Sequence, residues 1–285
     1  MSKVFKKTLI KIDDNVVKLE INDSTVEKVI DFYNEAPFPN FEDNDDKSSI
    51  NQKGDNNYLA KQFKNFIGFN KDILEVGCGT GQFWVENYSS LPANSHLTLT
   101  DFSEGMIEKI SSKLEHSNIT FEVADIEDLR YEDNTFDLVM AHHVIYHSSD
   151  KDKAISELKR VTKSGGTISI TSNSEKHMLN VYTISHSIDD NYSMVRNIDG
   201  FTEEDADKIL PSHFENYQKE VYEDLLEVTD SEFMLEYIKS TTEPRKMNLK
   251  ESFYDEWAKI VKDEVDEKGF FGILKRSPNF ICRKN

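Results

Sequence analysis

Asp72-Ile-Leu-Glu-Val-Gly-Cys-Gly-Thr-Gly81 is a short apolar run that leads directly into a turn with glycines at 77, 79 and 81. Residues 82–88, which follow it, can begin a helix. A strand that passes through a glycine turn into a helix brings backbone N–H groups and the positive end of the helix to one place. Glycine suits such a turn because a Cβ would disfavour φ > 0 and keep a ligand away from the backbone. The stretch therefore predicts a site for a nucleotide-like ligand.

Strand and helix patterns alternate from this stretch onward. Strand-like runs occur at 72–76, 96–100, 119–123, 136–140 and 167–171. Helical patterns separate them at about 80–90, after Ser103 as a cap, and at about 150–162, with Gly165-Gly166 as the turn into the last of these strands. This alternation is typical of an α/β fold with a doubly wound, Rossmann-like parallel sheet and helices on both faces.

The flanking regions are less regular. Two β-rich runs within 8–21 predict a hairpin, and helical patterns begin at Ser24 and Tyr58, so residues 1–70 are interpreted as an N-terminal hairpin and helical lid. Residues 71–285 form the main domain, with insertions at about 173–213 and 230–268. The elements expected there are helices at 175–188, from Thr202 to Pro211 and at 249–268, a strand at 217–228, and a terminal hairpin or one long bent strand at 270–282.

Composition limits the class of partner and the compartment. The chain has 34 basic and 53 acidic residues, a net charge of −19, so most of its surface would repel a nucleic-acid backbone. Cys78 and Cys282 are its two cysteines, which argues against a disulfide framework or a cysteine zinc site. No apolar run has the length of a membrane span. We expect a cytoplasmic protein with no membrane partner and no bound metal.

The glycine spacing bears on the kind of ligand. A dinucleotide fingerprint is G-x-G-x-x-G, whereas this turn is G-x-G-x-G and has Gln82 where the fingerprint has glycine or alanine. Asp101 ends the second strand, where a carboxylate can accept from both hydroxyls of a ribose. Asp125 ends the third strand, where it can accept from an exocyclic amine. An NAD-dependent oxidoreductase is therefore disfavoured, and a nucleoside ligand without a pyrophosphate is favoured.

Taken together, residues 72–172 resemble a class I S-adenosylmethionine-dependent methyltransferase. Ile73-Leu-Glu-Val-Gly-Cys-Gly-Thr-Gly81 is similar to the first motif of that family and Thr100-Asp-Phe-Ser-Glu-Gly-Met106 to its second. Residues 124–126, 136–140 and 158–166 are similar to later blocks, and the overall similarity is to small-molecule methyltransferases near the ubiquinone-biosynthesis type. The resemblance implies a seven-stranded sheet whose last strand is antiparallel. It also implies S-adenosyl-L-methionine as cofactor, S-adenosyl-L-homocysteine as product, a small-molecule acceptor with an O or N nucleophile, and a monomer or homodimer.

The resemblance also implies cofactor contacts. Gly77 and Gly79 admit the methionine part, Glu75 orders the turn, and the N–H groups of the turn face the methionine carboxylate. Asp101 binds the ribose and Phe102 packs on the adenine. The implied cofactor-binding residues are Tyr33 (as an aromatic lid), Glu75, Gly77, Cys78, Gly79, Asp101, Phe102, Met106, Asp125 (toward the adenine amine), Ile126 (along the ring) and His142 (at the methionyl end).

Three histidines follow the fourth strand, where the methyl group should emerge. Methyl transfer from a sulfonium needs a general base only if the acceptor loses a proton early, as a hydroxyl does. His147 and His143 are the candidates for that base, and the alternative is that their rings pack or contact substrate without proton transfer. A non-catalytic cofactor-binding protein and, less favoured, an RNA methyltransferase stay open as alternatives.

Overall fold

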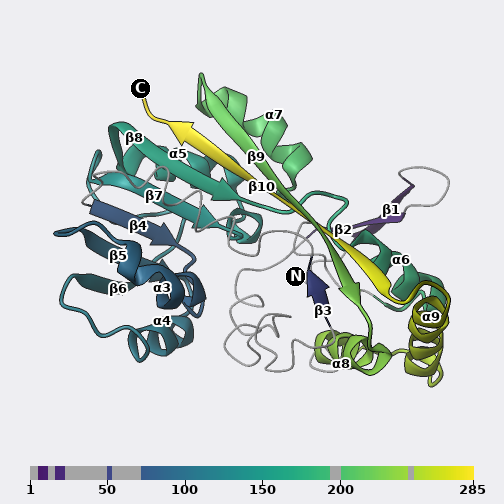
Figure 1. Cartoon of the computed structure of the whole chain (residues 1–285). Helices are drawn as coiled ribbons and strands as arrows, with labels where there is room; N and C mark the ends of the chain where they lie inside the picture. Colours follow the sequence, from purple (N-terminus) through teal and green to yellow (C-terminus); the bar gives the residue numbers. More distant parts are fainter. Residues whose placement is uncertain (1–5, 12–16, 23–49, 53–71, 193–199, 243–246) are drawn as a thin grey trace.

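The computed structural model describes residues 6–11, 17–22, 50–52, 72–192, 200–242 and 247–285 (Figure 1). For the first three of these ranges it gives the backbone pairing alone. β1 (Lys6–Lys11) pairs antiparallel with β2 (Val17–Asn22), so the two runs at the N-terminus form the hairpin that their pattern predicts. The predicted helical lid and Tyr33 lie outside the described residues.

The main sheet of the described residues has eight strands in the order β3-β9-β10-β8-β7-β4-β5-β6. β4 to β8 are mutually parallel, and β10 is antiparallel to both β8 and β9, which confirms seven strands with an antiparallel last one. β3 adds a three-residue edge. The bounds are β3 Ile50–Gln52, β4 Asp72–Val76, β5 His96–Asp101, β6 Ile119–Val123, β7 Phe136–His142, β8 Thr162–Thr171, β9 Tyr217–Val228 and β10 Phe271–Arg283.

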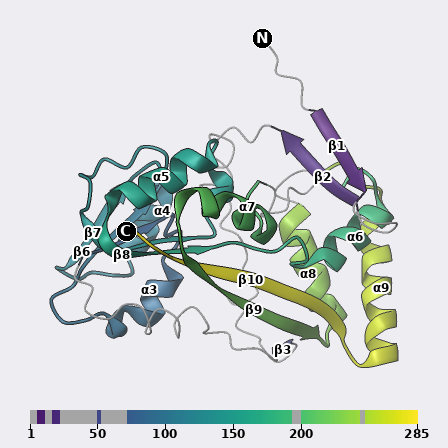
Figure 2. The same ribbon diagram turned by 90° about the horizontal axis from the view of Figure 1, so that it is seen from above.

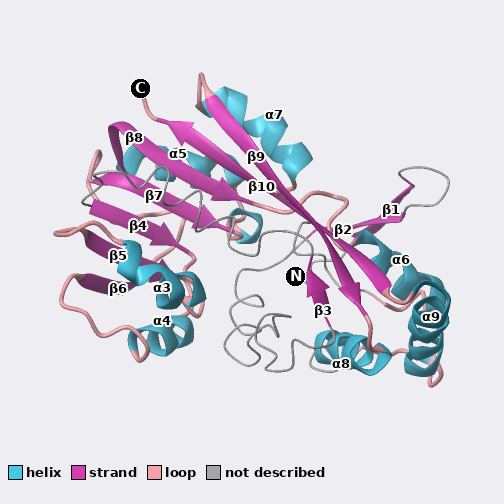
Figure 3. Cartoon of the chain, viewed as in Figure 1, coloured by secondary structure: helices cyan, strands magenta, loops and turns pink. Residues whose placement is uncertain are grey.

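Helices cover both faces of the parallel part. α3 (Gln82–Asn87) and α4 (Glu104–Ser111) place Trp84 and Ile110 against Ile73, Leu97 and Met140 of the sheet. α5 (Lys151–Val161) and α7 (Glu203–His213) bury a larger core on the opposite face, and Figure 3 shows helices on each side of the sheet. Successive residues of a strand point to opposite faces of the sheet. Because these strands are apolar almost throughout, both faces of the sheet are apolar and need helices to cover them.

Local signals predicted most helix starts, but the helices predicted at 175–188 and 249–268 begin four residues later, at Leu179 and Phe253, and two further elements differ in their bounds. Ser103 Oγ accepts from Met106 N at the start of α4, as its position before the helix predicts. α7 does not end at Pro211 but continues to His213, because a proline in the last turn removes one N–H and the bond from Phe214 N to Leu210 O still closes the turn. β8 begins at Thr162 and not at 167, and it carries an irregularity opposite Phe136 and Leu138 that holds the two glycines.

β9 and β10 are much longer than the central strands. They have 12 and 13 residues against five in β4, so residues 271–283 form one long strand and not a hairpin of their own. Figures 1 and 2 show both strands running from the parallel sheet to a second group of helices, α6 (Leu179–Ile188), α8 (Ser231–Thr242) and α9 (Phe253–Lys268). Trp257, Phe271 and Ile273 lie in the apolar core there. The strands therefore join two cores.

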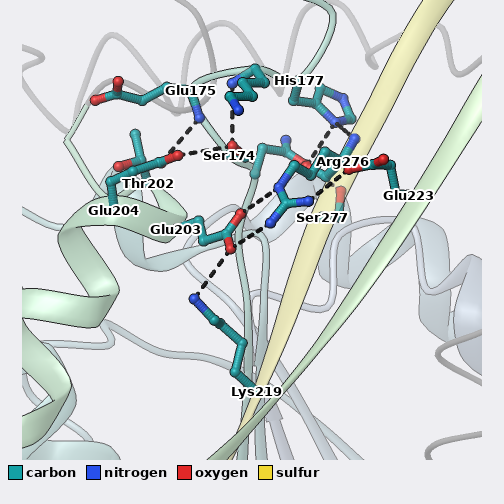
Figure 4. A network of polar contacts seen from close by, with 12 residues as sticks. Ser174, Glu175, His177, Thr202, Glu203, Glu204, Lys219, Glu223, Arg276 and Ser277 are labelled. Atoms are coloured by element: carbon teal, nitrogen blue, oxygen red, sulfur yellow. Dashed lines mark hydrogen bonds and ion pairs between the residues drawn. The ribbon is translucent and has the colours of Figure 1, made fainter.

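A polar network fixes the place where α7 meets these two strands (Figure 4). The Glu203 carboxylate accepts from Arg276 Nε and Nη2 at 2.8 and 3.0 Å and pairs with Lys219 Nζ at 3.2 Å. Burial alone would raise the pKa of Glu203, but the hydrogen bonds from Arg276 and Lys219 outweigh it and lower that pKa. The backbone N–H of Arg276 donates to His177 Nδ1 at 3.1 Å. The segment after β8 is thereby attached to the long strands.

No helix among the described residues has both the length and the apolar character to cross a membrane.

Candidate functional site

The glycine turn lies between β4 and α3, at the carboxyl edge of the sheet. Gly77 N and Cys78 N both donate to Thr100 O, at 2.8 and 2.9 Å, and Gly81 N donates to Cys78 O at 3.0 Å. Gly79 N donates to Asp101 Oδ2 at 2.9 Å. These four N–H groups are thus bonded within the protein, which corrects the expectation that the N–H groups of the turn face a ligand carboxylate. Their role is to fasten the turn to the end of β5.

The three glycines of the turn have positive φ, but they differ in their surroundings. A Cβ on Gly81 would lie 1.7 Å from Ile110 Cδ1, and one on Gly77 would lie 2.4 Å from Val144 Cγ2. A Cβ on Gly79 would meet no atom of the described residues within 4 Å. Packing therefore demands glycine at 77 and 81, whereas none of the residues that the structure describes covers the backbone at Gly79, next to the carboxylate of Asp101. That opening is the kind of surface a ligand can approach closely.

Asp101 ends β5 and joins the turn to α4. Its Oδ1 accepts from Ser103 N at 2.9 Å and its Oδ2 from Gly79 N, and the N–H of Phe102 also bonds to this carboxylate, which keeps some acceptor capacity for a further donor. Burial raises the pKa of Asp101, although the backbone hydrogen bonds oppose the shift. The next side chain, Phe102, is 40% exposed although it is large and apolar. A held carboxylate beside an exposed aromatic ring fits a ribose with an attached base.

The other residues implied to contact the cofactor differ in their exposure to solvent. Asp125 is exposed after β6, and its Oδ1 accepts from Glu127 N at 2.8 Å. Val123 is 56% exposed on the same strand. Ile126 and Met106 are buried, Ile126 within the core that α5 covers. Asp125 is thus exposed to solvent, whereas Ile126 and Met106 have little exposed surface.

Glu75 lies under the turn and is almost fully buried. Its Oε2 accepts from Trp84 Nε1, and its Oε1 lies 3.8 Å from His142 Nδ1. Burial raises the pKa of Glu75 to about 8, opposed by the Trp84 hydrogen bond and reinforced by the charge of Asp101. The role implied for Glu75, to order the turn, agrees with a carboxyl group that contacts α3 and approaches β7.

This raised pKa gives a pH test of the buried carboxyl group. A folded pKa of about 8 against an ordinary 4.5 means that the folded state binds more protons than the unfolded state between those values, so Glu75 makes stability fall as pH rises there. In Glu75→Gln the neutral amide still accepts from Trp84 Nε1. We expect the free energy of unfolding of the wild type, measured in urea, to fall below that of the variant progressively from pH 4.5 to 8. Parallel profiles would show that Glu75 ionises normally.

His142 is the last residue of β7, His143 follows it, and His147 ends the short helix Ile145–His147 just after it. Burial lowers the pKa of His142 to about 3 and those of His143 and His147 to about 4, with further lowering at His143 from Lys275 and at His147 from Lys151. All three rings are therefore neutral near pH 7. His143 has φ +54°, unusual for a residue with a side chain, and its N–H donates to Thr171 O. Strained backbone of this kind is concentrated at functional sites.

Comparison with known proteins identifies this arrangement. A family described as "Methyltransferase domain" matches residues 68–230, more than half of the 285 residues. The chain belongs to this methyltransferase family. The match begins just before the glycine turn, and it contains Asp101, Asp125 and the three histidines. The motifs that resemble the class I S-adenosylmethionine-dependent enzymes all lie within the matched residues.

Curated relatives of this chain match it over part of their length. It is 37% identical over 125 residues to a malonyl-[acyl-carrier protein] O-methyltransferase of Buchnera aphidicola, covering 44% of this chain and 48% of the relative. It is 34% identical over 102 residues to a ubiquinone/menaquinone biosynthesis C-methyltransferase of Geobacter sp. strain M21, covering 34% and 43%. This chain therefore spans less than half the length of these two relatives.

Solved structures share the fold of this chain at low identity. A Bacillus halodurans protein is 19% identical with a TM-score of 0.53, covering 80% of this chain and 98% of that chain. The YcgJ protein of Bacillus subtilis is 15% identical with a TM-score of 0.53, covering 80% and 97%. These similarities support the α/β fold described above.

Several residues at the candidate site are not evident from the sequence motifs. Trp84 of α3 donates its indole N–H to Glu75. This pair could have been predicted, because a buried indole N–H needs an acceptor. Ser169 and Lys275 come near His142 and His143 from β8 and β10, strands that lie far along the chain. Within the described residues, no group of three His, Cys, Asp or Glu side chains is placed to hold a metal ion.

Proposed function

We propose that this chain transfers a methyl group from S-adenosyl-L-methionine to a small-molecule acceptor. The observation that carries the proposal is the backbone at Gly79, where no described residue would meet a Cβ, next to a held Asp101 carboxylate that keeps some acceptor capacity. A ribose needs two acceptors of this kind, and a methionyl chain needs close approach to the backbone. The residues present therefore fit the cofactor of the family.

Three residues are proposed to hold the cofactor. Asp101 accepts from the ribose hydroxyls, Phe102 covers one face of the adenine, and Asp125 accepts from its amine. When bound, S-adenosylmethionine supplies an electrophilic methyl group on a sulfonium. Because its leaving group is good, the remaining task of the protein is to orient the acceptor and exclude water.

The acceptor end is proposed to lie at the three histidines. His143 and His147, the latter in a short helical turn (Ile145–His147) beside Tyr146, are our candidates for a general base. Both rings are neutral near pH 7, but a pKa of about 4 makes each a weak proton acceptor, so this role requires that the bound substrate raise that pKa. The two relatives named above perform an O-methylation and a C-methylation, so neither fixes the nucleophile for this chain. An O or N nucleophile on a small molecule remains our proposal, as does a cytoplasmic monomer or homodimer.

Calorimetric titration with S-adenosylhomocysteine and, separately, NADH tests the cofactor. We expect saturable binding of S-adenosylhomocysteine and none of NADH, because the turn has no third glycine at dinucleotide spacing. Binding of NADH alone would overturn the proposal. Turnover is then assayed against a panel of hydroxyl and amine metabolites, and cofactor binding without turnover across the panel would favour a non-catalytic cofactor-binding protein.

A further inference from the structure

A line of buried polar side chains crosses the sheet on the face that α3 and α4 cover. Asn279 of β10 accepts from Ser169 Oγ of β8 at 2.9 Å, and Ser169 Oγ lies 3.0 Å from His142 Nε2 of β7. His142 Nδ1 in turn faces Glu75 Oε1 of β4 at 3.8 Å, and Glu75 Oε2 accepts from Trp84 Nε1. Ser169 and Asn279 have no exposed surface. Four strands thus contribute one connected set of polar groups that ends beneath the glycine turn.

The hydrogen bonds of Ser169 determine which ring nitrogen of His142 carries the proton. A hydroxyl has one proton, and Ser169 gives it to Asn279 Oδ1. Ser169 Oγ must therefore accept from His142, so Nε2 carries the ring proton. A neutral imidazole has one N–H, and burial lowers the pKa of His142 to about 3, so Nδ1 is a bare lone pair.

We propose that Ser169 and Asn279 are positioning residues that hold His142 in its Nε2–H tautomer, so that His142 Nδ1 presents a lone pair to Glu75. A protonated Oε1 facing that lone pair is a donor facing an acceptor, whereas an ionised carboxylate would face a second lone pair. The opposite tautomer would instead offer an N–H to the carboxylate and favour its ionised form. The tautomer therefore helps to set the protonation of Glu75, whose segment leads into the turn.

Other groups near Glu75 also influence its protonation. The titratable groups that face it are Asp101 on β5, Cys78 in the turn and His142 on β7, and His142 itself is next to His143. The charge of Asp101 reinforces the neutral form of Glu75. None of these groups changes when Ser169 is replaced, so a change in Glu75 on replacing Ser169 reports the tautomer.

The experiment uses long-range ¹H–¹⁵N NMR of the ligand-free full chain. His142→Gln assigns the ring signals, and the Trp84 Nε1–H signal, followed against pH, reports the titration of Glu75. In the wild type we expect the Nε2–H pattern. In Ser169→Ala we expect loss of that pattern and a Glu75 midpoint lower by about one pH unit or more. Ser169→Thr should restore both, and Thr167→Val, which removes a hydroxyl two residues earlier on β8, should change neither.

Two results would overturn the proposal. One is an Nδ1–H tautomer in the wild type, and the other is an unchanged pattern and midpoint in Ser169→Ala. Should Ser169→Ala not fold, Asn279→Leu is the substitute, because without its acceptor the Ser169 hydroxyl is free to donate to Nε2 and the Nδ1–H tautomer should appear.

The consequence for the site rests on the proposed function, so it is measured separately. Calorimetry with S-adenosylhomocysteine is expected to show binding weakened about tenfold by Ser169→Ala and unchanged by Thr167→Val. If the wild type fails to bind, the proposed function is wrong while the tautomer result stands. If the wild type binds and Ser169→Ala binds equally well, the positioning role is wrong while the function stands.

Discussion

Asp101→Ala is expected to weaken the binding of S-adenosylhomocysteine by roughly 1–3 kcal/mol, the cost of leaving ligand hydroxyls without their acceptors. The structure adds a second cause, because Asp101 Oδ2 also holds the N–H of Gly79 at 2.9 Å. Losing that bond releases the part of the turn where the backbone is open. Calorimetric titration of wild type and variant measures the change, and unfolding in urea shows whether the variant is still folded under those conditions.

Ser103→Ala is the matched control for that variant. It removes the Oγ that caps α4 through Met106 N and leaves the Asp101 carboxylate in place, so it should cost about 1 kcal/mol of stability. Affinity for S-adenosylhomocysteine should stay at the wild-type value. If Asp101→Ala binds as tightly as Ser103→Ala, the ribose is held elsewhere and the assignment of Asp101 is wrong.

The central half of the fold was predictable because its determinants are local. The run Asp72–Val76, the glycines after it and the cap at Ser103 each specify their own element within a few residues. Asp101 was predictable for the same reason, since the last residue of a parallel strand lies at the carboxyl edge of the sheet in this fold whatever the rest of the chain does.

The remainder depended on contacts between distant segments. The length of β10 follows from its pairing with β9 over residues 217–228, and a sequence pattern of apolar residues interrupted by Lys275 and Arg276 does not reveal that pairing. The carboxylate of Glu203, hydrogen-bonded by Arg276, explains why that interruption is tolerated. Likewise the N–H groups of Gly77 and Cys78 are bonded to Thr100 O, a partner that the local glycine pattern could not indicate.

Two alanine substitutions in the glycine turn are expected to differ in their main effect, which is on stability for Gly81→Ala and on cofactor affinity for Gly79→Ala. Gly81→Ala places a Cβ 1.7 Å from Ile110 Cδ1 at φ +70°, so backbone strain and overpacking together should lower the free energy of unfolding by roughly 2–4 kcal/mol. Gly79→Ala at φ +55° has strain without a clash among the described residues, and should lower it by about 1–2 kcal/mol. Its methyl group instead occupies the open space beside Asp101, so affinity for S-adenosylhomocysteine should fall at least about tenfold.

The clash at Gly81 can be tested by removing the atoms that cause it. Ile110→Ala deletes both Cδ1 and Cγ1, which would lie 1.7 and 2.4 Å from the new Cβ, so the double variant Gly81→Ala/Ile110→Ala should be less destabilised than the sum of the two single variants. Gly79→Ala is more than 4 Å from any such partner among the described residues, so Ile110→Ala should simply add to it. Equal loss of affinity in Gly79→Ala and Gly81→Ala, after correction for the unfolded fraction, would contradict the assignment. The opening at Gly79 would then not be where the cofactor meets the backbone, because a methyl group there would cost no more than general loosening of the turn.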